Sequence, residues 1–294
     1  MINVVDNTML ALYKQCPHQF YWRMVKGLIV KRDNTHPGDV ALNYGIAIHE
    51  ALDVWFRNLK PTSDENLIDA ITAFTLKFLP YEGLDIKQIR TLENGILALQ
   101  KYAKNYPLDQ EPFTILPQHI ETGFAVSLGR YVYCGRIDKL ARWRAPGFEG
   151  YIIIDHKTSS SSGFLTTKPN AALDGYIYGA SLVLGERVVG AMLDQIYTLK
   201  TKINFIRELT SRTEDETQIW MQDTQDWIDD INTCIIHNNW RRNTNACMNF
   251  GRRCEYMQLC TAHKHSIDSL SIAFYEEKRW NPYKEDNVDN NKIG

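Results

Sequence analysis

Residues 151–158 read Tyr-Ile-Ile-Ile-Asp-His-Lys-Thr, and this stretch decides how the rest of the chain is organised. Three consecutive isoleucines are typical of a central strand that is covered on both faces. Asp155 and Lys157 share one face of that strand because side chains alternate along it, and His156 points to the other face. A buried charge without a partner costs several kcal/mol. The strand end is therefore expected to carry a function.

The strand that precedes it carries a second carboxylate. Residues 121–143 alternate in polarity around a turn at Gly129-Arg130, which predicts a β-hairpin. A second turn follows at 144–150. If it centres between Pro146 and Gly147, Asp138 lies opposite Asp155 on an antiparallel strand, with Cβ atoms roughly 5 Å apart. Two carboxylates at that distance repel each other unless a cation lies between them.

Carboxylate oxygens that leave water positions open are the ligands of Mg²⁺ or Mn²⁺. Such an ion lowers the pKa of a water, and Lys157 can orient that water or stabilise developing negative charge. This combination suits phosphodiester hydrolysis. The alternative is a simple Asp–Lys ion pair at the end of a strand.

Gly135-Arg-Ile-Asp138, followed by Ile-Ile-Asp-His-Lys-Thr at 153–158, resembles the core of the PD-(D/E)XK nucleases, in particular the RecB-like and CRISPR-associated exonucleases. Members of that branch carry a histidine in a Gly-x-x-x-His-Glu context, and this chain has Gly45, His49 and Glu50 in those places. The resemblance implies that His49, Asp138 and Asp155 bind Mg²⁺ or Mn²⁺ and that Lys157 acts beside them in catalysis. It also implies a restriction-endonuclease-like core.

The same branch has a Gln-x-x-x-Tyr motif on the helix after the catalytic strand. Tyr176 matches the tyrosine, whereas Ala172 stands in place of the glutamine. The resemblance implies a catalytic role for Tyr176, and core packing is the alternative. Either Asp174 substitutes for the glutamine or the site is altered. Glu121 opens the first strand, where related enzymes often have an acid.

The whole chain is expected to be α/β, with a small mixed central sheet flanked by helices. A single nuclease domain is predicted over residues 1–265, with a helical insertion at about 59–112, and residues 266–294 are predicted to form a polar tail. The net charge of −2 over 294 residues excludes a wholesale polycation. No signal-peptide pattern or membrane-spanning run is present, so an intracellular location without membrane contact is expected.

Six cysteines in an intracellular chain are more often thiols or metal ligands than disulfides. Cys247, Cys254 and Cys260 have spacings that differ from a zinc knuckle. The resemblance implies that Cys16, in a Cys-Pro context, joins them around a [4Fe–4S] cluster that ties segments 10–30 and 240–262 together. A structural Zn²⁺ site is the alternative.

Basic residues gather around these cysteine segments and predict a local DNA-binding patch. Its arginines are Arg23, Arg241, Arg242, Arg252 and Arg253. Tyr21, Trp22, Trp240 and Tyr256 could stack on unpaired bases. The alternative is an ordinary solvated face.

The combined prediction is a metal-dependent DNA exonuclease that acts on DNA ends or single strands in recombination, replication or DNA-end processing. DNA and recombination or replication proteins are the expected partners, and the resemblance includes stand-alone versions encoded by phages. The alternatives are a non-catalytic DNA-binding protein that keeps the fold and the cluster, and a zinc-stabilised RNA-processing factor.

Overall fold

A computed structural model describes residues 1–31, 37–57, 59–145, 148–160, 165–200, 202–249 and 252–283. The turn predicted at Pro146–Gly147 and the end of the predicted tail, residues 284–294, lie outside the described residues. Within the described ranges, no helix is both long enough and apolar enough to cross a membrane.

The contacts within the chain divide it into two compact units, where the sequence predicts one domain over residues 1–265. Unit 1 comprises residues 1–32, 125–135 and 214–294, and unit 2 comprises 33–124 and 136–213. The β-hairpin of β3 (Phe113–Leu128) and β4 (Tyr131–Ala145) contributes its tip to unit 1 and its base to unit 2.

The sheet of unit 2 contains β3 and β4 together with β5 (Phe148–Ser159), β6 (Val188–Thr198) and β7 (Ile203–Ser211), in the order β3-β4-β5-β6-β7. The strands β5 and β6 are parallel and the pairs β4–β5 and β6–β7 are antiparallel. The helix α6 (Ala171–Leu184) makes the crossover that a parallel pair requires. This is the mixed sheet that the sequence predicts, with the addition of β7, whose side chains are mostly half-buried.

The register of the central pair agrees with the predicted one. Lys139 lies opposite Ile154 and Leu140 lies opposite Ile153. Asp138 and Asp155 are the next residues on the two strands, so the pairing that a turn at Pro146–Gly147 predicts continues to the site.

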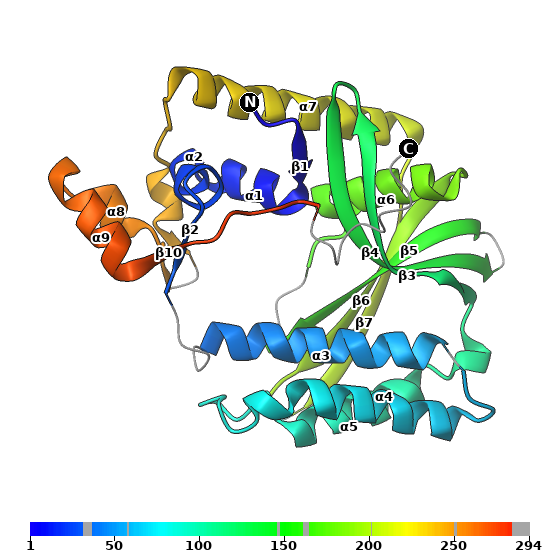
Figure 1. The fold of residues 1–294 in the computed structure, drawn as a ribbon. Coiled ribbons are helices and arrows are strands. Elements are labelled where there is room, and N and C mark those ends of the chain that lie inside the picture. Colours follow the sequence, from blue (N-terminus) through cyan, green and yellow to red (C-terminus); the bar gives the residue numbers. More distant parts are fainter. Residues whose placement is uncertain are drawn as a thin grey trace. The chain divides into compact units, whose positions relative to one another are not determined.

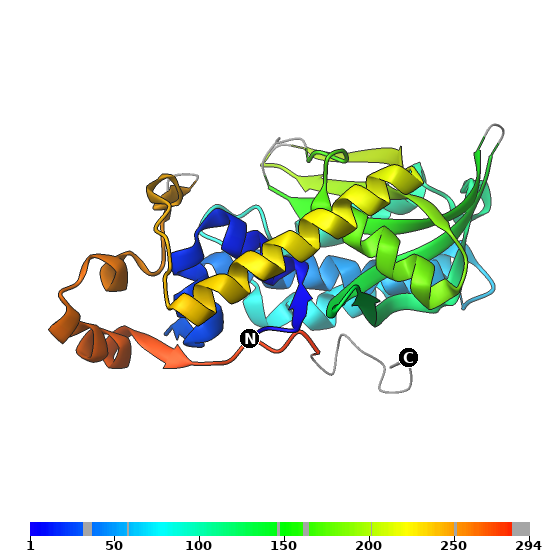
Figure 2. The ribbon, with the colours of Figure 1, turned by 90° about the horizontal axis from the view of Figure 1, so that it is seen from above.

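The helices of unit 2 cover both faces of its sheet. The helices α3 (Pro37–Arg57), α4 (Ser63–Phe78) and α5 (Leu92–Asn105) lie on one face and α6 lies on the other (Figure 1). Short 3₁₀ turns at Leu79–Tyr81 and Leu108–Gln110 complete the helical segment. Figure 2, seen from above, shows α6 in front of the strands. The α4–α5 pair corresponds to the predicted helical insertion at 59–112.

The core of unit 2 joins α3 to the sheet. Ile48, Leu52 and Trp55 on α3 pack in one buried cluster with Ile152 and Ile154 of β5. Burial of large apolar side chains on both partners holds α3 at a fixed position beside the end of β5. The residues at 49 and 53, between these apolar positions, are thereby presented to the strand ends.

Unit 1 is built from both ends of the chain. Its first segment contains β1 (Val4–Asp6), α1 (Asn7–Gln15), α2 (Pro17–Phe20), a π-helical turn (Tyr21–Val25) and β2 (Leu28–Val30). Its last segment contains α7 (Glu214–His237), β8 (Met248–Asn249), β9 (Arg252–Arg253), α8 (Met257–Thr261), α9 (Ile267–Phe274) and β10 (Tyr275–Glu277), with 3₁₀ turns at Thr244–Ala246 and Lys264–Ser266. Pro17 occupies the first position of α2, where a proline is tolerated, and α1 ends just before Cys16.

The prediction of a polar tail from residue 266 is wrong for its first part. This stretch forms α9 and β10, and β10 pairs antiparallel with β2 near the other end of the chain. Tyr275 is buried against Trp22, Tyr256 and Leu259. One apolar anchor and a few backbone hydrogen bonds are therefore enough to order a segment whose composition is mainly polar.

Candidate metal-dependent active site

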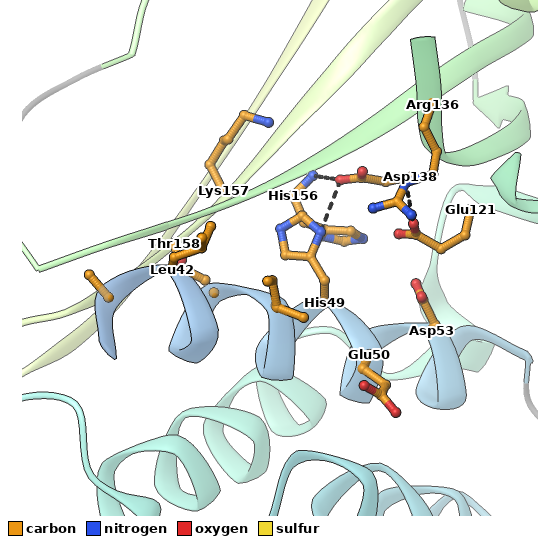
Figure 3. A pocket seen from close by; sticks show the side chains of 13 residues that line it. Leu42, His49, Glu50, Asp53, Glu121, Arg136, Asp138, His156, Lys157 and Thr158 are labelled. Carbon is orange, nitrogen blue, oxygen red and sulfur yellow. Dashed lines mark hydrogen bonds and ion pairs between the residues drawn. The ribbon is translucent and has the colours of Figure 1, made fainter. Parts of the chain in front are cut away.

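The ends of β4 and β5 bring the two predicted aspartates together. The backbone N–H of His156 donates a hydrogen bond of 2.8 Å to Oδ2 of Asp138. The Asp138 carboxylate is thereby held against the strand that carries Asp155 and Lys157. Figure 3 shows this bond together with the side chains that surround it.

Asp155 and Lys157 form a close ion pair, with Nζ of Lys157 2.7 Å from Oδ2 of Asp155. Burial raises the pKa of Asp155 to about 6, against the opposing effect of Lys157 and with the support of the Asp138 charge. Burial alone would lower the pKa of Lys157, but the carboxylates of Asp155 and Asp138 outweigh it, and that pKa is raised. The lysine therefore stays protonated beside carboxylates.

His49 reaches Asp138 from α3, with its Nδ1 3.4 Å from Oδ2 of the aspartate. Burial lowers the pKa of His49, and this outweighs the opposing Asp138 charge. Burial acts to raise the pKa of Asp138, yet the positive groups around it, His49 and Lys157 first, bring it below its usual value. A carboxylate beside an imidazole is a pair of ligand types that a divalent cation can use.

Glu121 joins this pair, although its place at the start of a predicted strand is the only indication in the sequence. One ligand atom each from His49, Glu121 and Asp138 lies within 4.8 Å of the others, and no other such group occurs in the described part of the chain. Glu121 adopts a positive φ of 53° inside β3, which is unusual for a residue other than glycine. Its carboxylate reaches the site from this position in the middle of β3.

Charge and burial make Glu121 an unusual carboxyl group. Its Oε2 lies 2.9 Å from Nε of Arg136. Burial, with the nearby charges of Asp53 and Asp138, nevertheless raises the pKa of Glu121 to about 7. A cation would relieve this repulsion between carboxylates. The predicted ligands are His49, Asp138 and Asp155. The structure groups His49 and Asp138 with Glu121, and Asp155 lies beside them in an ion pair with Lys157.

These side chains line an open pocket of about 490 Å³. One wall is the face of α3 that carries His49, Glu50 and Asp53, and the other wall is the end of β5 (Figure 3). Arg136 and Lys157 also line it and supply positive charge. A pocket with carboxylates, an imidazole and two cations can hold a divalent ion and a phosphate group together.

A buried ion pair joins β4 to the part of α3 that lines the pocket. Lys139 is 0% exposed, and its Nζ lies 2.6 Å from Oδ1 of Asp53. The ammonium also lies 5.5 Å from the centre of the Phe56 ring. The pair fixes Asp53, one turn beyond His49, at the edge of the pocket.

His156 points to the opposite face from Lys157, as strand alternation predicts. Its Nδ1 lies 3.3 Å from Oδ2 of Asp194 on β6. Tyr102 donates a hydrogen bond to the same carboxylate, and Arg207 lies 3.3 Å from its other oxygen. This buried network anchors the residue whose backbone N–H holds Asp138.

Tyr176, on α6, is close enough to Lys157 to influence its pKa electrostatically. Asp174 instead forms a 2.5 Å ion pair with Arg212, which also donates to the carbonyl of Thr167. Asp174 is therefore committed to a buried structural contact, and it is poorly placed to substitute for the glutamine that the family motif has at position 172.

The four cysteines Cys16, Cys247, Cys254 and Cys260 come together in unit 1. All of them line one small cavity of about 30 Å³. Burial raises the pKa of Cys254, and the other three thiols add to that shift. Cys16 follows α1, and its Sγ accepts a hydrogen bond of 3.4 Å from the N–H of Asn243.

The spacing of the thiols bears on the metal. Within the described residues no three cysteine sulfurs lie within 4.8 Å of one another. Four sulfurs around one zinc, each at about 2.3 Å, would be roughly 3.8 Å apart. The four thiols therefore line one cavity without forming a group as compact as a single bound zinc ion needs.

The predicted DNA-binding arginines all lie in unit 1. Arg241, Arg242, Arg252 and Arg253 are exposed, and Arg23 is half-exposed and stacks over Trp280 at 5.4 Å. Two of the aromatic residues predicted to stack on bases do not present a face to solvent. Trp22 and Tyr256 are buried with Leu259 and Tyr275, because the α9–β10 segment covers them.

The family model of the PD-(D/E)XK nuclease superfamily matches residues 7–261. The chain therefore belongs to this superfamily, and the mixed sheet flanked by helices is its nuclease core. No curated protein matches the chain.

Two solved structures are similar over most of the chain. A protein described as SSO0001 shares 15% identity, with a TM-score of 0.31, over 77% of this chain and 75% of that one. A protein from Eubacterium rectale, described as a candidate exonuclease, shares 9% identity, with a TM-score of 0.45, over 89% of this chain and 94% of that one.

Proposed function

We propose that the protein is a metal-dependent exonuclease that hydrolyses phosphodiester bonds at DNA ends or in single strands. The observation that carries the proposal is the convergence of His49, Glu121 and Asp138 beside the Asp155–Lys157 pair. Carboxylate oxygens with one imidazole suit Mg²⁺ or Mn²⁺. His49, Asp138 and Asp155 would hold the ion, with Glu121 as an additional ligand.

A bound divalent ion would supply a water of lowered pKa and would offset the charge of the scissile phosphate. The protein's own groups do the rest. Lys157 stays protonated, and it can hold the attacking water or stabilise the negative charge that develops on the phosphate. Tyr176, near Lys157, can orient the same phosphate. Hydrolysis adds the elements of water across one P–O bond, which leaves a phosphate monoester and a free hydroxyl.

The test is degradation of linear single- and double-stranded DNA with Mn²⁺, with Mg²⁺ and with EDTA. We expect activity in the wild type with metal, and a loss of at least about a hundredfold in Asp155→Ala and Lys157→Ala. Lys101→Ala is the matched control, because Lys101 is an exposed lysine on α5 of the same unit. Activity that survives both active-site substitutions would contradict the proposal.

DNA binding without cleavage in any metal would favour a non-catalytic DNA-binding protein. The observation that favours this alternative is Ala172, which stands in place of the family's glutamine. Filter binding with the catalytic variants and the wild type separates the two functions.

We further propose that Cys16, Cys247, Cys254 and Cys260 hold a [4Fe–4S] cluster that stabilises unit 1. The expected result is brown protein with iron and sulfide in equal amounts after anaerobic purification. The variant Cys254→Ser should lose the iron and have a lower melting temperature. The control variant Cys234→Ser should keep the iron, because Cys234 is a buried cysteine that is hydrogen-bonded to Tyr13. Colourless wild type with stoichiometric zinc would refute the cluster.

We propose that the exposed arginines of unit 1 contact DNA phosphates. The expected setting is inside a cell, with recombination or replication proteins as partners. Replacing Arg252 and Arg253 by glutamine should weaken DNA binding and reduce its dependence on salt.

A further inference from the structure

Two apolar side chains of α3 are exposed beside the candidate active site. Leu42 is 62% exposed and Ile46 is 41% exposed, and both line the pocket that contains His49 and Asp138. We call this pair the apolar shelf. Exposed apolar surface next to a polar site is a common sign of a binding surface.

The apolar shelf lies in line with the metal-binding groups. Leu42, Ile46 and His49 are spaced at i, i+4 and i+7, so they share one face of α3. With a rise of 1.5 Å per residue, Ile46 lies about 4.5 Å and Leu42 about 10.5 Å along the helix axis from His49. This is the length scale of one nucleotide.

The end of β5 lies close to α3 at Gly45, next to the shelf. A Cβ on Gly45 would lie 3.0 Å from Oγ1 of Thr158, so the absence of a side chain there allows α3 and the end of β5 to approach each other. Gly45, Thr158 and the shelf all line the same pocket. The pocket therefore extends from the carboxylates to the two apolar side chains of the shelf.

We propose that the apolar shelf receives the flat face of an unpaired nucleobase, from the nucleotide next to the phosphate that is cleaved. This rests on the proposed nuclease function and specifies its substrate. A nucleotide has an anionic end and an apolar ring face, and the pocket has cations and candidate metal ligands at one end and aliphatic side chains at the other. An aliphatic ligand would match only the second of these.

The base must be unpaired for this contact. In a duplex both faces of a base are stacked on neighbours, and taking it out of the stack costs a few kcal/mol. That cost is least for single strands and frayed ends. Leucine and isoleucine carry no side-chain hydrogen-bonding groups, so the contact is expected to tolerate any base.

The experiment is a double-mutant cycle that combines a substitution in the protein with the removal of one base from the substrate. Wild type and Leu42→Ser/Ile46→Ser are compared on a single-stranded oligonucleotide and on matched oligonucleotides with one abasic site, placed at each end in turn. Initial rates are measured with Mn²⁺, and binding is measured by fluorescence anisotropy with Ca²⁺ instead. The double substitution Ile68→Ser/Leu76→Ser is the control, because these exposed apolar residues lie on α4.

We expect the wild type to lose about tenfold in kcat/KM on one of the abasic substrates. The shelf variant should lose about the same factor on the intact strand and show no further loss on that abasic substrate. The inference would be overturned if the shelf substitutions and the abasic site lower kcat/KM by factors that multiply, or if the shelf variant loses no activity on the intact strand. A change in oligomeric state on light scattering would also overturn it, because it would show that the shelf binds a second copy.

The two proposals can fail separately. A wild type that degrades no DNA contradicts the nuclease function, yet the anisotropy cycle still decides whether the shelf contacts a base. A wild type that degrades DNA with no coupling between shelf and base contradicts only the shelf.

Discussion

The substitution Glu121→Gln should stabilise the metal-free protein at neutral pH and should make the protein less stable than the wild type when metal is added. In metal-free protein, burial and neighbouring carboxylates raise the pKa of Glu121 from 4.5 to about 7. A carboxyl group with a raised folded pKa stabilises the fold below its unfolded pKa, and that contribution is lost as the pH rises through about 7. A difference of about 2.5 pKa units corresponds to about 3 kcal/mol.

Glutamine resembles the protonated form, so it avoids this loss. In EDTA, the stability of Glu121→Gln relative to the wild type should therefore increase between pH 5 and pH 8, by up to about 3 kcal/mol. For a unit of this size that corresponds to roughly 6–12 °C in melting temperature. Scanning calorimetry at several pH values measures it. Glu149→Gln is the control, because Glu149 also pairs with an arginine but is exposed.

In Mn²⁺ the wild type, rather than Glu121→Gln, should be the more stable of the two proteins. An ion bound by the wild type at a thousand times its Kd adds about 4.1 kcal/mol to the stability, which exceeds the advantage of about 3 kcal/mol that the variant has in EDTA. The glutamine variant lacks one anionic ligand and should gain less. A variant–wild-type difference that is flat with pH in EDTA, or equal stabilisation of both proteins by Mn²⁺, would refute the assignment of Glu121 to the site.

Three further substitutions test the support of the site. Asp53→Ala should cost about 3–5 kcal/mol in urea denaturation because it leaves the ammonium of Lys139 buried without its carboxylate, whereas adding Lys139→Met should restore most of that loss. A double variant as unstable as the single one would contradict this. Asp194→Asn should destabilise by about 1–3 kcal/mol, since Tyr102 and Arg207 lose a charged acceptor while Arg207 keeps its ion pair with Glu111, and wild-type stability in the same assay would argue against the network. Gly95→Ala should lower the melting temperature because its Cβ would lie 1.9 Å from Cζ of Phe74, and an unchanged value would mean that the ring moves freely.

The central strands could be predicted from the sequence because the relevant signals are local. Three isoleucines mark β5, and the turn residues set the register that places Lys139 opposite Ile154. Alternation then orients Asp155, His156 and Lys157. These inferences need only the period of a strand and the position of one turn.

The parts that could not be predicted depend on contacts between distant segments. Glu121 lies in the site beside His49 and Asp138, which come from a helix and another strand, and neither this grouping nor its positive φ is marked by the residue type. The pairing of Lys139 with Asp53 joins a strand to a helix far away in the sequence, and a lysine in an alternating strand would ordinarily be assigned to the surface. The order of α9 and β10 likewise depends on β2, near the first residues.

The division of the chain has a consequence for how the protein is made. The pocket residues from Ala41 to Thr158 belong to unit 2, which ends at residue 213. Three of the four cysteines that line the small cavity of unit 1 leave the ribosome later: Cys247, Cys254 and Cys260. The whole of unit 2 is therefore synthesised after Cys16 and before its three partners. The pocket of unit 2 can thus form on a nascent chain in which the four cysteines of that cavity are not yet all present.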